Sequence, residues 1–90
     1  MSNRCYVTKR RAHELIDAAC AGKPDKTREA HQKTNDVPAH CQIYVHFTPR
    51  GARLYHKNVG RTVVWKIASL NPLLAREVLY GKDGGPNDPS

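Results

Sequence analysis

The sequence has no long apolar run and few cysteines. No stretch approaches the roughly 18 apolar residues that a membrane span needs, and no apolar export segment follows the basic residues near the N-terminus. The three cysteines, Cys5, Cys20 and Cys41, are odd in number and widely spaced. This spacing argues against the disulfide framework of a small secreted domain. We therefore expect no membrane association, reduced thiols and a cytoplasmic location.

Acidic residues are missing from the middle of the chain. No Asp or Glu occurs between Val37 and Arg76, whereas the whole chain carries 15 Lys and Arg against 8 Asp and Glu, a net charge of +7. A strongly basic balance of this kind favours attraction to polyanions. The acid-free segment also holds three histidines that gain charge below neutral pH, namely His40, His46 and His56.

Motifs for metal binding and catalysis are also lacking. The sequence has no CxxC pair, and His40 and His46 would share one strand face while Cys41 points to the other, so we expect neither a metal site nor a cofactor. No carboxylate near the histidines could orient one as a base, so we expect no enzyme. The alternative is a metal-independent ribonuclease, with His46 or His56 as the base and Arg53 or Lys57 holding the phosphate.

The pattern of apolar residues predicts an α+β protein with one compact domain over residues 1–81. Thr8 is a good N-cap for a helix that runs to about residue 21, and its inward face would hold Ala12, Leu15, Ile16, Ala19 and Cys20. Residues 23–38 are almost entirely polar, which suits either a solvated helix or a mobile loop. A short strand at 5–7 is a further option.

After residue 40 the apolar residues alternate with a period of two, which predicts a three-stranded antiparallel β-meander over 40–48, 52–57 and 61–68. Asn58, Val59 and Gly60 would form the loop between the last two strands. Asn71 and Pro72 predict the start of a short C-terminal helix that ends near Tyr80. The Gly- and Pro-rich tail, 82–90, is expected to be disordered.

The parity of each strand residue predicts which sheet face it occupies. One face would be apolar and covered by the helices, with Cys41, Ile43, Val45, Phe47, Leu54, Val63, Trp65 and Ile67. The other face would be cationic and exposed, with Gln42, Tyr44, His46, Arg53, Tyr55, Lys57, Thr62, Val64 and Lys66.

Such a face suits nucleic acid, because Lys and Arg neutralise phosphates and exposed rings stack on unpaired bases. The sequence therefore predicts a small nucleic-acid-binding protein, with Lys9, Arg10 and Arg11 at the first helix as a second basic patch. The predicted binding residues are Lys9, Arg10, Arg11, Tyr44, His46, Arg53, Tyr55, Lys57, Arg61 and Lys66.

A different class of function uses the same residues. Exposed tyrosines flanked by cations also anchor protein interfaces, so the alternative is an inhibitor or adaptor of the phage or mobile-element type. Its partner would be an acidic protein surface or a ribonucleoprotein complex. An exposed strand edge at 40–48 or 52–57 would also support a homodimer.

Overall fold

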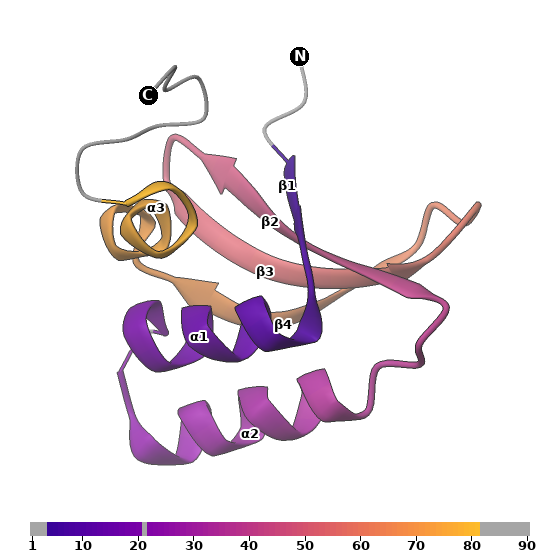
Figure 1. Cartoon of the computed structure of the whole chain (residues 1–90), viewed down its shortest axis with the longest axis horizontal. Coiled ribbons are helices and arrows are strands. Elements are labelled where there is room, and N and C mark those ends of the chain that lie inside the picture. The colour runs from indigo at the N-terminus through magenta and orange to yellow at the C-terminus, as the bar shows by residue number, and fades with distance from the viewer. Residues whose placement is uncertain (1–3, 21, 82–90) are drawn as a thin grey trace.

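The computed structural model of the chain describes residues 4–20 and 22–81, and Figure 1 shows how its helices and strands are arranged. Within these residues three helices and four strands make an α+β fold, which is the fold class that the sequence predicts. The predicted tail, 82–90, lies outside the described residues. In chain order the elements are β1 (Arg4–Val7), α1 (Lys9–Ala19), α2 (Pro24–Asn35), β2 (Cys41–Thr48), β3 (Gly51–Asn58), β4 (Val64–Leu70) and α3 (Pro72–Tyr80).

The sheet has four strands rather than the three predicted, in the order β1-β2-β3-β4 with every neighbouring pair antiparallel. The additional strand is β1, whose Cys5 lies opposite Val45 of β2. Both α1 and α2 separate β1 from β2 in the sequence, so a local pattern of four residues gives no sign of this long-range pairing. The strands expected to offer a free edge to a second copy, 40–48 and 52–57, are β2 and β3, the two inner strands of the sheet.

Helix α1 forms as predicted at its start and on its buried face. The Thr8 hydroxyl accepts a hydrogen bond from the Arg11 amide at 3.1 Å and so caps the first turn. The helix ends at Ala19 rather than near residue 21, because Cys20 turns to extended backbone and pairs with Leu70 at the end of β4. The residues of α1 that enter the core are Ala12, Leu15, Ile16 and Ala19.

The polar segment after α1 is a helix, which decides between the two options that the sequence leaves open. Pro24 occupies the first turn of α2, and Glu29 and Lys33 form an ion pair of 3.4 Å one turn apart. Thr34 is fully buried, yet its hydroxyl is satisfied because it donates to the Ala30 carbonyl at 2.9 Å.

Two histidines attach α2 to α1. The rings of His13 and His31 stack with centroids 4.6 Å apart, and their Nδ1 atoms share a hydrogen bond. Each outer nitrogen is also bonded, His13 Nε2 to Asn35 at 2.8 Å and His31 Nε2 to Asp17 at 2.7 Å. This chain of polar contacts replaces the apolar stripe that α2 lacks.

Strand β4 begins at Val64, three residues later than predicted, and its register against β3 is irregular. Leu54 lies opposite Ala68 whereas Tyr55 lies opposite Lys66, so Ile67 is skipped. A bulge of this kind changes which side chains face the core. Ala68 and Leu70 face the core as a result, and Ile67 is buried beside them.

Val63 and Trp65, which the sequence places in the core, are instead 58% and 46% exposed. The helices cover the end of the β3–β4 ladder near Leu70, whereas the hairpin end extends beyond them (Figure 1). Trp65 therefore lies on the helix side of the sheet but beyond the helical layer.

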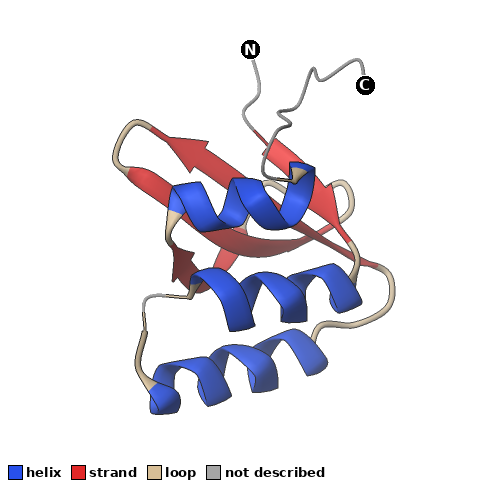
Figure 2. Ribbon diagram, turned by 60° about the vertical axis from the view of Figure 1, so that its left-hand side comes forward, coloured by secondary structure: helices blue, strands red, loops and turns tan. Residues whose placement is uncertain are grey.

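The three helices form one layer on one face of the sheet, with α1 between α2 and α3 (Figure 2). The core lies between this layer and the sheet, and Val45 and Leu54 at its centre are fully buried. Asn71 caps α3 as predicted, by accepting from the amides of Leu73 and Leu74. Within residues 4–20 and 22–81, no helix has the length and apolar character to cross a membrane.

We predict that Leu54→Ala lowers the free energy of unfolding by about 2–5 kcal/mol, because it opens a cavity in the centre of the core. Leu73→Ala is the matched control. The same atoms are removed there from a side chain that is 72% exposed, and the expected change is within about 0.5 kcal/mol. Urea denaturation measures both, and equal losses for the two variants would contradict the described core.

Candidate functional site

The sheet face opposite the helices, called the open face below, carries most of the polar side chains of the four strands. Strand pairing arranges these side chains in rows that run across the sheet. The rows are Arg4, His46, Arg53 and Ser69; Tyr6, Tyr44, Tyr55 and Lys66; and Gln42, Lys57 and Val64.

The middle row is aromatic. Ring centroids are 5.5 Å apart between Tyr6 and Tyr44 and 5.6 Å apart between Tyr44 and Tyr55, which is the usual range for paired rings. Tyr44 was expected to be an exposed ring, but it is only 2% exposed, because Tyr6, Tyr55 and the Arg4 guanidinium enclose it. The accessible rings are those of Tyr6, which is 52% exposed, and Tyr55, which is partly exposed.

The enclosure of Tyr44 has an electrostatic consequence. Burial raises the pKa of the Tyr44 phenol, and the nearby Arg4 offsets this shift only in part. The guanidinium carbon of Arg4 lies 4.8 Å from the ring centroid, a cation–π distance. Tyr44 is therefore a neutral ring at physiological pH that supports its two neighbours and positions Arg4.

The predicted cations Arg53, Lys57 and Lys66 do come together on the open face. Arg53 is exposed beside His46, and Lys66 lies opposite Tyr55. Lys57 reaches along the hairpin to the Arg61 carbonyl, which accepts from its Nζ at 3.1 Å. Arg61 itself lies in the β3–β4 connection, outside the strands.

Arg4 and Tyr6 also belong to this face, although neither is among the predicted site residues, because the predicted three-stranded sheet does not include β1. Arg4 lies opposite His46 and Tyr6 lies opposite Tyr44. The alternation of Arg4 and Tyr6 with Cys5 and Val7 is the signal that could have placed them. This alternation indicates which sheet face each residue occupies only when β1 is known to pair with β2.

The charges of the described residues are divided between the two layers. Every acidic residue lies in a helix or at a helix end: Glu14, Asp17, Asp25, Glu29, Asp36 and Glu77. The strands contain none, and their cations Arg4, Arg53, Lys57 and Lys66 all lie on the open face. With no carboxylate among its described residues, the open face has a positive potential that its own side chains do not cancel.

The second predicted patch, Lys9 to Arg11, lies at the start of α1 in the helical layer. Lys9 donates to the Asn35 carbonyl at 3.3 Å, so its ammonium group joins α1 to the end of α2. Arg11 pairs with Glu14 at 2.8 Å and also donates to the Val78 carbonyl. Two of these three cations thus make contacts within the fold, on the opposite side of the sheet from Arg53.

The two histidines considered for catalysis lie on opposite faces. His46 is on the open face, whereas His56 is on the helix side, where its ring stacks on Trp65 with centroids 5.4 Å apart. Arg53 and Lys57 therefore share a face with His46 and not with His56. In the described part of the chain, no three His, Cys, Asp or Glu side chains are grouped to hold a metal ion, and the three thiols are free.

Fold and surface together define a small α+β protein with a helical layer on one side and a cationic, aromatic sheet face on the other. Compared with known protein families, curated protein sequences and solved structures, the chain matches none of them.

The His56–Trp65 stack predicts a pH dependence of stability. Burial lowers the pKa of His56 from its usual 6.5, and the described residues offer its buried Nδ1 no hydrogen-bond partner. As the pH falls below 6.5, the unfolded chain takes up this proton before the folded protein does. We therefore expect the free energy of unfolding to fall between pH 6.5 and the lowered pKa.

The measurement is urea denaturation followed by the fluorescence of Trp65, the single tryptophan of the chain, between about pH 8 and pH 5. His56→Gln cannot titrate and should lose less stability on acidification than the wild type. His40→Gln, at an exposed position, is the control that should behave as the wild type. The same loss on acidification in His56→Gln and the wild type would show that His56 is not the responsible group.

Proposed function

We propose that the protein binds single-stranded nucleic acid on the open face of its sheet. The observation that carries the proposal is the combination of partly exposed rings and four cations on a sheet face that has no carboxylate among its described residues. Cations release counterions from phosphates, and rings give unpaired bases a surface to stack on. Neither effect depends on base identity, so we expect weak sequence preference.

Each part of the face would have a distinct role. Tyr6 and Tyr55 flank the enclosed Tyr44 and would each stack with one base. Arg53 and Lys57 would contact the phosphates between successive nucleotides. Arg4, held over the Tyr44 ring at 4.8 Å, adds positive charge close to both stacking positions.

The aromatic row favours a single strand over a duplex. Bases in a duplex are stacked on each other and show only their edges in the grooves, so a ring on a sheet face cannot stack on them. Unpaired bases can turn outward onto tyrosine rings. A purely cationic face would bind both forms, whereas the exposed ring of Tyr6 adds a contact that only a single strand can use.

The first test is the salt dependence of binding to a mixed-sequence oligonucleotide, measured by fluorescence anisotropy. About three or four phosphate contacts predict a slope of roughly −2 to −3 in log affinity against log salt concentration. Arg53→Ala with Lys57→Ala should reduce this slope by about 1.4, because two contacts are lost. Arg28→Ala with Arg76→Ala removes the same charge from exposed helical positions and should leave the slope unchanged. An affinity that does not respond to salt would rule out the proposal.

The second test separates stacking from charge. Tyr55→Ala should weaken binding by about 1–3 kcal/mol, the usual contribution of one stacked base. Tyr55→Phe keeps the ring and should bind as the wild type does. If the phenylalanine and alanine variants bind equally weakly, the hydroxyl group of Tyr55 rather than its ring makes the contact, and the stacking role is wrong.

A second candidate function is docking on a protein, and the β3–β4 hairpin is the observation that favours it. Val59, Val63 and Trp65 are 64%, 58% and 46% exposed and belong to this one hairpin. Aliphatic side chains gain little from nucleic acid but are common in protein interfaces. Lys57 and Arg61 accompany them, so the partner surface would be apolar and acidic.

This candidate predicts a protein partner that remains bound after nuclease treatment of a pull-down. Val63→Ser with Trp65→Ala should abolish its capture. Leu73→Ser, at a position on α3 that is 72% exposed, should not affect it. Loss of every captured protein on nuclease treatment would leave nucleic acid as the direct ligand.

A further inference from the structure

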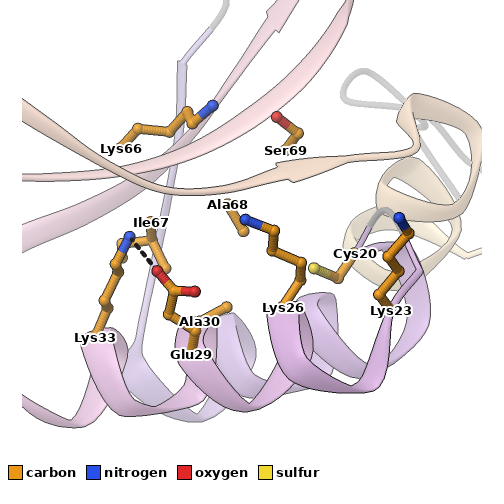
Figure 3. A pocket seen from close by; sticks show the side chains of 10 residues that line it. All are labelled: Cys20, Lys23, Lys26, Glu29, Ala30, Lys33, Lys66, Ile67, Ala68 and Ser69. Atoms are coloured by element: carbon orange, nitrogen blue, oxygen red, sulfur yellow. Dashed lines mark ion pairs between the residues drawn. The ribbon is translucent and has the colours of Figure 1, made fainter.

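A cleft about 320 Å³ in volume lies between α2 and the edge of the sheet at β4 (Figure 3). Its floor is formed by small and apolar side chains, among them Ala30, Ile67 and Ala68. Four lysines surround it: Lys23, Lys26 and Lys33 from the α2 side and Lys66 from β4. Among the described residues, no aromatic side chain lines it.

The charge in the cleft is strongly positive. Of the described residues that line it, only Glu29 is acidic, and it pairs with Lys33 at 3.4 Å, so the three other lysines outweigh it. The N-terminus of α2 adds to this potential. Its N-cap residue, Lys23, makes no side-chain capping bond, which leaves first-turn amides without that partner. Asp25 lies in the same turn but not among the residues that line the cleft.

The cleft is continuous with the open face around the edge of the sheet. Lys66 and Ser69 line the cleft, and both also belong to rows of the open face, opposite Tyr55 and Arg53. In Figure 3 they lie on the far side of the β4 ribbon from Ala68 and α2. Because β4 is an edge strand, no further strand separates the two surfaces.

We propose that this cleft holds backbone phosphates of the nucleic-acid strand that crosses the open face. The inference rests on the proposed function and extends it: the strand would pass from Tyr55 over Lys66 and around β4 to Lys26 and Lys23. Lysine is a point charge that suits phosphate, and without a ring the cleft offers bases nothing to stack on. Bases would therefore be bound on the sheet and phosphates alone in the cleft.

The volume of the cleft agrees with binding of phosphates there and of bases on the sheet. Ligand clefts commonly run from about 300 to 1,000 Å³, and this one is at the small end of that range. A narrow, phosphate-bearing chain segment can enter such a space, whereas a folded partner cannot. This path makes the binding site longer than the sheet face. The affinity should therefore depend on the length of the oligonucleotide.

The experiment compares oligonucleotides of about 4 and about 12 nucleotides, two lengths within the range of about 4 to 16 nucleotides that small single-strand-binding folds occupy. Lys23→Ala with Lys26→Ala should weaken binding of the longer strand and reduce its salt slope by about 1.4, because two phosphate contacts are lost. The short strand, which the sheet face alone can hold, should bind as before. Arg28→Ala with Arg76→Ala, at exposed helical positions outside both surfaces, is the charge-matched control and should change neither.

Failure of this inference is distinct from failure of the proposed function. If Lys23→Ala with Lys26→Ala leaves the long strand unaffected while Arg53→Ala with Lys57→Ala weakens both strands, the cleft assignment is wrong and the open face remains the site. If neither strand binds the wild type, the proposed function fails, and the inference about the strand's path fails with it.

Inorganic pyrophosphate tests the cleft without any nucleic acid. Titration followed by NMR should shift the amides of Lys26, Ile67 and Ala68 and leave that of Tyr55 in place. The shifts should vanish in the Lys23→Ala, Lys26→Ala variant, whose spectrum also reports whether it is folded. An oligoglutamate peptide that shifts the same amides at lower concentration than pyrophosphate would overturn the phosphate assignment in favour of an acidic peptide.

Discussion

The alternation of side chains along the paired strands β2 and β3 is the constraint on which the rest of the structure depends. Val45 and Leu54 lie opposite each other and face the helices, where both are fully buried. One residue further along, Tyr44 and Tyr55 are also opposite each other but on the other face. A slip of one residue in this register would exchange the core with the open face, so burial of the core also fixes the proposed binding surface.

Division of charge between the layers follows from the same arrangement. The helices and their ends carry all the acidic residues of the described chain, and several of these make contacts within the helical layer, such as Asp17 with His31 and Glu14 with Arg11. The described strands contain Arg and Lys but no Asp or Glu. The positive charge is thus concentrated on one face of the sheet, and the edge at β4 joins that face to a second group of lysines on α2.

Much of the fold was readable from local patterns. Thr8 and Asn71 were identified as helix caps, and the period of two after residue 40 placed the two inner strands to within about one residue. The same parity brought Arg53, Lys57 and Lys66 to one face. These predictions succeeded because caps and alternation depend on residues close together in the chain. The role of Lys9 to Arg11 in binding remains a prediction.

The remaining features depend on contacts between distant segments, which a local pattern does not contain. Pairing of β1 with β2 brought Arg4 and Tyr6 to the open face and enclosed Tyr44, a residue that parity alone had left exposed. The limited reach of the helices left Trp65 outside the core, although it lies on their side of the sheet. Docking of α2 through His13 and His31 created the lysine cleft.

By itself the sequence determined the elements, their caps and the composition of each inner strand face, because these are set within a few residues. The tertiary structure alone decided which rings are accessible and which lysines meet, because those depend on which elements pack side by side.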